Sequence, residues 1–555
     1  MPAYSLALSL LVTAPLLAPG YLLLRDAVST PRSYLSDAAL GLSGAAPRAL
    51  PQDFAIAVAS HVLDGGVVVK ALLVMGLWLA GLGAARFAAV VVPAAGLSGQ
   101  FVAATLAIWN PYVAERLLQG HWSLLVGYGC LPWVAAAVLR LRSGDVASRL
   151  ALMWPVLFWT ALAGLTPTGL MLAAVVALVC CAAPGAGRPR WVCAVVALGS
   201  AVLGALPWLV ASVGAGSLSS THAVGIHEFA ARAEPGLGTL GSLAGLAGIW
   251  NGQAAPDSRT TLFAVVATVT LLAVVAVGLP TVLRVPRAIP LLALAAVAVV
   301  LPALAATGPG LAALEATVRT VPGLGVLRDA QKWVALAMPG YAVAAAAAVV
   351  TLRPRIPAAV TGAVCCLALI AVLPDLAWGA GGKVTAVRYP AGWSTVAAMI
   401  NADPRPVAVL PPASMRTFAW AGDAPVLDPL PRLVSADVLS TGDLVIGGET
   451  VPGEGSRARE IESLVLSGAG ADELTRAGVG WVVVETSGAA TGSGEGLNLP
   501  VAYADDDLRL YRVGGDHPGS QSRGLLIAAH LGWLAALVVG GVGMALSARR
   551  RRLSS

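Results

Sequence analysis

Long stretches of this chain carry apolar side chains with no charge among them. Several of these stretches hold about 20 residues, which is the length that a helix needs to cross the hydrocarbon core of a bilayer, roughly 30 Å thick. Hydrophobic residues make up 57% of the 555 residues and charged residues only 12%, about half the share that is usual in soluble proteins. The sequence therefore predicts an α-helical protein that crosses a membrane many times.

The apolar runs predict about twelve transmembrane helices. Their expected bounds are roughly 4–24, 66–84, 88–108, 123–140, 151–166, 168–184, 191–212, 260–282, 288–306, 333–351, 357–375 and 523–547. The first run has no basic residue before it, because the first cation is Arg25. Its length also suits a retained helix better than a cleaved signal peptide.

The basic residues predict how these spans are oriented. Short connections rich in Arg face the cytoplasm in membrane proteins, and the C-terminal tail, 549–553, is one of them. Alternating backwards from that tail puts every short basic connection and both termini in the cytoplasm, in a plasma-membrane protein. The long connections, with nearly all of the acids, then lie outside; they are 25–65, 109–122, 213–259, 307–332 and 376–522. The net charge of +6 thus reflects topology, and we expect no nucleic-acid partner.

Residues 376–522 differ in character from the rest. Short β-type runs appear at 406–412, 481–485 and 508–513, and a helical stretch at 456–468 falls between them. Alternating strand and helix patterns indicate a small α/β domain. We therefore expect three parts, which are a multi-span body (1–375), an extracytoplasmic α/β domain (376–522), and a last helix with a basic tail (523–555).

The sequence offers little support for a metal or a familiar catalytic motif. The six cysteines lie in or at the ends of apolar runs, without metal-binding spacing. In "HAVGIHE" (222–228) two histidines lie five residues apart around a glycine, which is a weak metal pattern. No nucleophile elbow, P-loop, zincin or dinucleotide fingerprint occurs in its required context. We therefore expect no cofactor, and a divalent metal stays open as an alternative that the sequence does not support.

The stretch "WNPYVAERLLQGHW" (109–122) places polar groups between two apolar runs. Asn110 and Pro111 break the preceding helix, a short amphipathic helix with Glu115 and Arg116 follows, and the chain re-enters the membrane after His121. One interpretation is an interfacial helix whose charges are solvated. The other is a lid over a cavity at the membrane edge, in which Arg116 and His121 face an anionic head group.

The first external loop carries a candidate base. Arg25 and Asp26 directly follow the first predicted span, and Asp53 comes later. A carboxylate at the end of a span stays partly desolvated, which would raise its pKa and suit a general base acting on a hydroxyl. The alternative is an ordinary boundary charge paired with Arg25.

The stretch "LRDAQKW" (327–333) precedes a late span. Lysine is rare in this chain, so Lys332 near Arg328 is notable. An arginine fork and a lysine point charge together can bind a phosphate. The alternative is that both side chains only extend from the membrane boundary toward water.

With these residues in place, the chain resembles the polytopic GT-C glycosyltransferases of actinobacteria, in particular arabinofuranosyl- and mannosyltransferase-like members. "NPYVAERLLQGHW" is similar to the family stretch NPFVxERLxxGQW, and "LRDAQKW" is similar to an FRxxxKF element before a late span. The order of parts also agrees, with an acidic first external loop, a multi-span body and an external α/β domain.

The resemblance implies an inverting transfer of arabinofuranose or mannose at the outer face. The donor would be a polyprenyl-phosphate sugar, and the acceptor a cell-envelope glycan or glycolipid. The base maps to Asp26, with Asp53 as the alternative. The residues that would bind the donor phosphate or the substrate are Arg25, Glu115, Arg116, His121, Arg328 and Lys332. Asp26 is followed by Ala27 and Val28, so no DxD motif stands there, which suits a metal-free reaction.

Two other functions stay open at this point. A transporter or flippase for a lipid-linked glycan would carry polar residues in mid-span, and the predicted spans hold almost none. A non-catalytic envelope assembly protein would use the external domain to bind partners.

Overall fold

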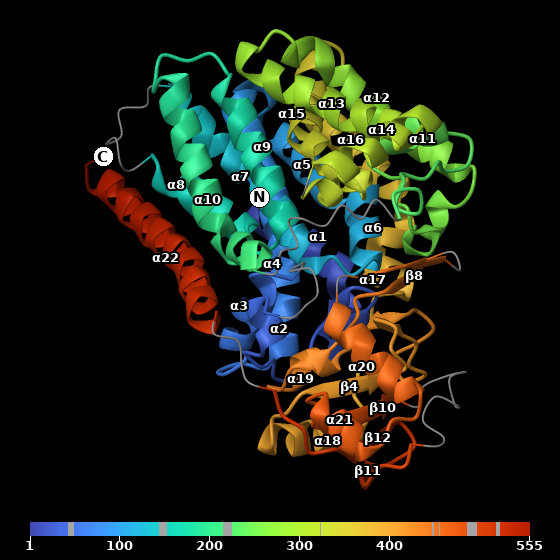
Figure 1. Cartoon of the computed structure of the whole chain (residues 1–555). Helices are drawn as coiled ribbons and strands as arrows, with labels where there is room; N and C mark the ends of the chain where they lie inside the picture. Colours follow the sequence, from blue (N-terminus) through green and yellow to red (C-terminus); the bar gives the residue numbers. More distant parts are fainter. Residues whose placement is uncertain are drawn as a thin grey trace.

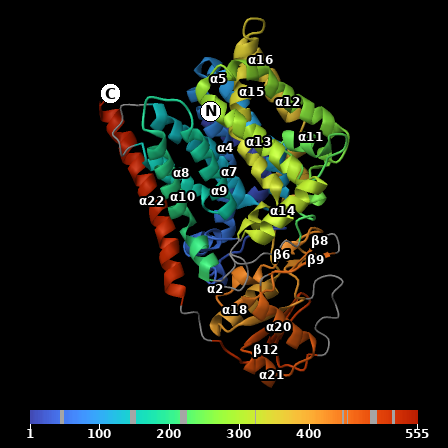
Figure 2. The same ribbon diagram turned by 45° about the horizontal axis from the view of Figure 1, so that its top comes forward.

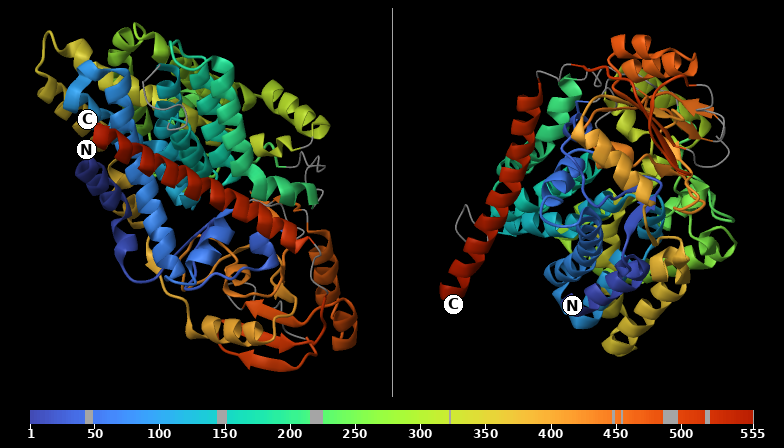
Figure 3. Two further views of the ribbon diagram at one scale, coloured as in Figure 1. Left: turned by 90° about the vertical axis from the view of Figure 1, so that its left-hand side faces the viewer. Right: turned by 90° about the horizontal axis from the view of Figure 1, so that it is seen from below.

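The chain forms a helical body with a smaller α/β unit at one end of it (Figure 1). The computed structural model describes residues 1–42, 49–143, 152–214, 225–321, 323–446, 449–453, 455–485, 497–517 and 522–554. Both termini lie at the end of the body away from the α/β unit (Figures 2 and 3).

Seven of the described helices are long and apolar enough to cross a membrane, which confirms a multi-pass, mostly helical protein. They are α4 (Gly65–Val91), α7 (Trp122–Ser143), α10 (Arg190–Gly214), α12 (Phe263–Val282), Pro286–Ala305 with α13 (Ile289–Ala305), Ala330–Leu352 with α15 (Met338–Leu352), and α22 (Arg523–Ser554). A pair bent by 72°, Ala358–Ala371 with Pro374–Gly382, makes an eighth if it is one span. The total of twelve stays a prediction.

Several predicted spans are shorter in the structure. The shorter apolar helices are Pro2–Leu17, α8 (Trp154–Ala163) and α9 (Pro167–Cys181). The predicted span 88–108 is divided, because α4 ends at Val91 and α5 (Gly96–Ile108) begins after a break at Pro93. Proline lacks the backbone N–H that a continuous helix needs.

Glycines allow α4 and α7 to pack closely in the centre of the body. A Cβ on Gly129 would lie 2.2 Å from the carbonyl oxygen of Gly76, and one on Gly76 would lie 2.9 Å from Cα of Val126. Small residues at such crossings let helix backbones approach in membranes, where apolar burial drives little association. Outside this pair, α22 packs along α8 and α10 (Figure 2).

The first predicted span, 4–24, is wrong in its C-terminal part. Helix α1 (Pro2–Thr13) passes into a short 3-10 turn, η1 (Ala14–Leu17), and the chain then forms strand β1 (Tyr21–Leu24). Pro15 and Pro19 interrupt the helical pattern, and Gly20 takes a φ of +130° that favours glycine. Strand β1 turns back into β2 (Ala27–Val28), so Arg25 and Asp26 form the two-residue turn of a hairpin.

The α/β unit is built on a five-stranded mixed sheet. The strand order is β11-β12-β10-β4-β7, in which β10 (Trp481–Glu485), β4 (Val407–Leu410) and β7 (Val438–Leu439) are parallel. Strands β12 (Leu508–Arg512) and β11 (Val501–Ala504) are antiparallel to their neighbours. The strands expected from the three β-type runs are therefore confirmed.

Helices cover both faces of this sheet. Helix α18 (Ala391–Ala402) supplies Trp393 and Ile400 to the core on one face. Helix α20 (Ser456–Leu466) and helix α21 (Ala471–Arg476) supply Ile461 and Leu474 to the core on the other. Burial on both faces explains why the residues of β4 and β10 are all buried and read as continuous apolar runs.

The α/β unit is joined to the hairpin that carries Asp26. Strand β3 (Ala386–Val387), which leads into the unit, pairs antiparallel with β1 to give the order β2-β1-β3. The side-chain hydroxyl of Tyr389 also donates to the carbonyl oxygen of Ser29, at 2.9 Å. The candidate site therefore forms where the body and the unit meet.

Candidate functional site

The stretch that the sequence singled out folds as helix α6 (Pro111–Leu118), and all of its residues are buried. The Asn110 side chain caps it by accepting from the backbone N–H of Val113, at 3.1 Å, and proline is well suited to the first helical position. Glu115 and Arg116 have no exposed surface. The interpretation of α6 as an interfacial helix with solvated charges is therefore wrong, because α7, α17 (Ala377–Gly382) and η4 (Gly252–Ala254) pack around it.

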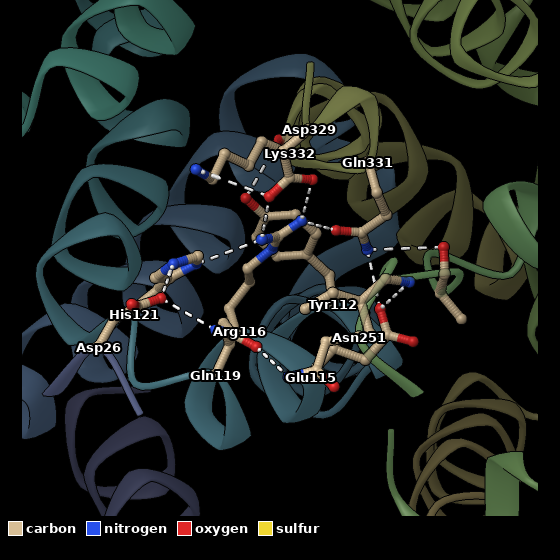
Figure 4. Close-up of polar contacts among 12 residues, drawn as sticks. Asp26, Tyr112, Glu115, Arg116, Gln119, His121, Asn251, Asp329, Gln331 and Lys332 are labelled. Carbon is tan, nitrogen blue, oxygen red and sulfur yellow. Dashed lines mark hydrogen bonds and ion pairs between the residues drawn. The ribbon is translucent and has the colours of Figure 1, made fainter. Parts of the chain in front are cut away.

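Arg116 connects α6 to the segment before α15 (Figure 4). Its Nη1 and Nη2 atoms donate to the two carboxylate oxygens of Asp329, at 2.8 and 3.1 Å. Nη2 also donates to Oε1 of Gln331. Asp329 and Gln331 thus accept from the two guanidinium nitrogens that we expected to bind an anionic head group.

Glu115 holds a loop of the body against the other side of α6. Its two carboxylate oxygens accept from the backbone N–H groups of Gly248 and Ile249, at 3.0 and 3.2 Å. Gln331 donates to the same carboxylate at 2.9 Å. Burial raises the pKa of Glu115, and the charge of Arg116 opposes that shift.

Asp26 reaches this network from the hairpin turn. Its Oδ2 atom lies 2.9 Å from Nε2 of His121 and accepts from the side-chain amide of Gln119 at 3.0 Å. Its Oδ1 atom has no hydrogen-bond partner among the described residues. The Asp26 side chain is 36% exposed, so this oxygen belongs to a carboxylate that water or a substrate can reach.

The neighbours of His121 determine which ring nitrogen carries the proton. Nη1 of Arg116 lies 3.2 Å from Nδ1 of His121, and a guanidinium can only donate. Nδ1 is therefore the acceptor, and Nε2 carries the proton that is donated to Asp26. Burial lowers the pKa of His121, which agrees with a neutral ring at pH 7.

The expected rise in the pKa of Asp26 is wrong in direction. Burial does disfavour the ionised form, but the hydrogen bonds from His121 and Gln119 and the charge of Lys332 outweigh it and lower the pKa. Hydrogen bonds donated to a carboxylate stabilise its charged form. Asp26 is therefore ionised at neutral pH.

Lys332 lies on the same side of Arg116 as His121 and Asp26 (Figure 4). Its Nζ atom is 3.6 Å from Oδ2 of Asp329, and its side chain is 25% exposed. Burial acts to raise the pKa of Asp329, but Arg116 and Lys332 hold it well below its usual range. A carboxylate and an ammonium group thus come to the edge of an otherwise buried network.

Three of the residues predicted to form the site have other surroundings. Asp53, on α3 (Gln52–Ala59), pairs with Arg432 of the α/β unit at 3.1 Å. Arg328 lies over the ring of Phe229, at 5.3 Å from its centre. The Arg25 side chain donates to two backbone carbonyl groups and makes no ion pair with Asp26.

The sequence did not assign a role to four members of the network. They are Gln119, Asn251, Asp329 and Gln331, which bridge segments more than 80 residues apart. Asn251, for instance, donates to Oε1 of Gln119 at 2.9 Å, and Gln119 in turn donates to Asp26. Gln119, Asp329 and Gln331 lie in the two stretches that the sequence singled out, and for Asn251 the available signal was the polar run "NGQ" (251–253) directly after apolar chain.

The described residues contain no group of three His, Cys, Asp or Glu side chains placed to hold a metal ion. What they do contain is a partly exposed carboxylate with one open oxygen, and a partly exposed ammonium group whose charge acts on that carboxylate. Such an arrangement can accept a proton from a hydroxyl and stabilise an anionic leaving group.

Comparison with solved structures finds a similar fold, whereas no family model and no curated protein sequence matches the chain. The chain superposes on the cryo-EM structure of arabinofuranosyltransferase AftD from mycobacteria with a TM-score of 0.59 and 17% identity. A structure of a mutant of that enzyme gives a TM-score of 0.55, also at 17% identity. The first match covers 93% of this chain but only 40% of AftD. The resemblance to GT-C glycosyltransferases is therefore confirmed at the level of the fold.

Proposed function

We propose that this protein is a GT-C membrane glycosyltransferase that acts at the outer face of the plasma membrane. It transfers arabinofuranose or mannose, with inversion, from a polyprenyl-phosphate donor to a cell-envelope glycan or glycolipid. The observation that carries the proposal is the Asp26 carboxylate, which is partly exposed and whose Oδ1 atom has no hydrogen-bond partner among the described residues, while the charge of Lys332 acts on it. The AftD-like fold supports the same reaction class.

In the proposed reaction, Asp26 acts as the base and Lys332 stabilises the leaving group. Asp26 Oδ1 accepts the proton of the acceptor hydroxyl while that oxygen forms a bond to the anomeric carbon of the donor. The bond from that carbon to the phosphate oxygen breaks, and the polyprenyl phosphate leaves with the electron pair. Lys332 stabilises the charge on the leaving phosphate as a point charge.

The other predicted site residues support these two groups. His121 and Gln119 orient the Asp26 carboxylate. Arg116 and Glu115 fix α6 to the segments that carry Asp329, Gln331 and Gly248. Asp53 acts in the joint between α3 and the α/β unit, through its ion pair with Arg432.

The test is transfer by the purified protein in liposomes. Radiolabelled decaprenyl-phosphate arabinose and decaprenyl-phosphate mannose are supplied in parallel with an envelope glycan acceptor, and the Asp26→Asn variant serves as control. Transfer of one sugar by the wild type, lost in the variant, supports the proposal. A folded wild type that transfers neither sugar would favour the assembly-protein alternative, and label crossing the bilayer without transfer would favour a flippase.

The proposed topology has its own test. Residues 376–522 are proposed to be extracytoplasmic, and the termini lie at the opposite end of the body (Figure 3). Ser467 is an exposed residue of the α/β unit, so Ser467→Cys should react with an impermeant maleimide in intact cells, above the background of the native cysteines. Labelling that appears only after lysis would place the unit in the cytoplasm and overturn the proposed outer-face reaction.

A further inference from the structure

The backbone of Arg25 is bound on both sides by the α/β unit. Its N–H donates to the carbonyl oxygen of Pro425 at 2.9 Å, and its carbonyl oxygen accepts from the N–H of Leu427, also at 2.9 Å. Arg25 has a φ of +49°, a left-handed conformation that costs a non-glycine residue roughly 1–2 kcal/mol. The two hydrogen bonds from residues 425–427 therefore stabilise a turn conformation that the chain disfavours.

The Arg25 side chain is bound by the helical body. It is 7% exposed, with Nη1 donating to the carbonyl oxygen of Leu118 at 2.6 Å and Nη2 to that of Gln253 at 3.0 Å. Leu118 is the last residue of α6 and Gln253 lies in η4, so the guanidinium joins two separate parts of the body. Both terminal nitrogens of the guanidinium are thus bound to backbone carbonyl groups of the body rather than to Asp26.

Asp26, the next residue, depends on the same turn. Its backbone N–H donates to the carbonyl oxygen of Gln119 at 3.2 Å, and Gln119 and His121 bind its carboxylate. A rotation of the turn would move the carboxylate relative to these partners, which lie on a different element. Displacing a catalytic group by about 1 Å can cost on the order of 10²-fold in rate.

From these contacts we infer that Arg25 is a positioning residue through which the α/β unit holds the Asp26 carboxylate in place, so that this unit forms part of the active site. The inference rests on the proposed function. It replaces the role in phosphate binding that the sequence suggested for Arg25.

The test compares contacts to the turn with another contact between the same two parts. Arg25→Met removes the side-chain clamp, Arg25→Lys keeps its charge, and Leu427→Pro removes the N–H that donates to the Arg25 carbonyl. Arg432→Met is the matched control, because it breaks the ion pair with Asp53 that also joins the α/β unit to the body, at two residues outside the hairpin. Thermal unfolding of each variant is measured beside kcat and KM.

We expect Arg25→Met to lower kcat about 10²-fold with little change in the KM for the donor, and Leu427→Pro to act in the same direction. Arg25→Lys should stay impaired, because one ammonium group cannot span both carbonyls. Hydrogen exchange should be faster at residues 22–28 in these variants and unchanged there in Arg432→Met, which should keep a kcat close to that of the wild type.

Two results would overturn the inference. One is full recovery of kcat in Arg25→Lys, which would mean that only the charge matters. The other is an equal loss in Arg432→Met, which would mean that any weakening of the joint has the same effect. If the proposed function itself were wrong, the result would differ: the wild type would show no transfer, or Asp26→Asn would transfer as well as the wild type.

Discussion

Nε2 of His121 lies 2.9 Å from Oδ2 of Asp26, and Arg116 determines that this contact is a hydrogen bond from a neutral ring. Because the guanidinium can only donate to Nδ1, the proton of the imidazole must be on Nε2. The same arrangement keeps Asp26 ionised, since the donated hydrogen bond stabilises the carboxylate.

This relationship predicts how the rate depends on pH. A base acts only when ionised, so kcat/KM falls as the pH drops through the pKa of Asp26. That pKa lies below the ordinary value of about 3.9. We therefore expect kcat/KM to stay level from pH 8 down to about pH 5, about one unit above the ordinary value.

Replacing His121 should move the acidic limb of that profile. His121→Phe keeps an aromatic ring and removes the donor to Asp26, so the pKa of Asp26 rises and the limb moves to higher pH. Profiles of kcat/KM for the wild type and the variant, measured in the same series of buffers, test this. A limb that stays in place in His121→Phe would show that His121 does not tune the base.

Removing the base should abolish most of the chemistry. Asp26→Asn keeps the shape of the side chain but cannot accept a proton, so we expect kcat to fall about 10²- to 10⁴-fold with donor binding nearly unchanged. Asp53→Asn is the comparison, because Asp53 binds Arg432 and lies outside the network around Arg116. If Asp53→Asn abolished turnover and Asp26→Asn did not, the role of base would pass to Asp53.

Lys332 should matter for donor binding. Lys332→Met removes the ammonium group that pairs with Asp329 and whose charge acts on Asp26, and it keeps most of the stem. A hydrogen bond to a charged group contributes about 1.5–3 kcal/mol, so donor affinity should fall roughly 10- to 150-fold. Lys383→Met is a matched control, because Lys383 pairs with Asp257 at 2.5 Å, outside this network. Equal donor affinity in both variants would contradict the assignment.

The buried pair of Arg116 and Asp329 should be needed for stability. Their side chains are 0% and 8% exposed, so Arg116→Met leaves the Asp329 carboxylate buried with Lys332 as its one ionic partner among the described residues. Breaking such a pair costs about 3–5 kcal/mol. The double variant Arg116→Met with Asp329→Leu should unfold at a higher temperature than Arg116→Met alone, because it leaves no buried carboxylate without its guanidinium partner. A lower unfolding temperature in the double variant would speak against this account.

The parts of the fold that follow from local pattern could be predicted from the sequence. Charge-free runs gave the long helices, and the run at 481–485 gave the central strand of the α/β unit. The strand at Tyr21–Leu24 could not be predicted in the same way. Its residues are as apolar as those of a span, and its partner at 386–387 lies more than 360 residues away.

The candidate site shows the same division. The polar residues of 109–122 were recognisable because they interrupt apolar chain, and so was Lys332 because lysine is rare. The roles of these residues could not be recognised, because they depend on which side chains are buried in the folded protein and on what those side chains contact there. The charges of Glu115 and Arg116 look solvated in a sequence, whereas in the structure they bind Gly248 and Asp329, more than 130 residues away.

Gly120 gives a final test of how closely the hairpin must fit against the end of α6. It has a φ of +84°, and a Cβ placed there would lie 2.3 Å from the carbonyl oxygen of Leu24 and 2.4 Å from the backbone nitrogen of Ala27. These two atoms flank the turn that carries Asp26, so Gly120→Ala should displace the turn and lower kcat about 10²-fold. Gly96→Ala separates this effect from backbone strain, because Gly96 also has a positive φ, of +59°, but its Cβ position has no atom of a packed neighbour within 4 Å in the part of the chain that the structure describes. Both variants should lose roughly 1–3 kcal/mol of stability to a backbone conformation that disfavours alanine, and only Gly120→Ala should lose activity at a temperature where both are folded. Equal activity in the two variants would mean that the position of the hairpin does not limit the reaction.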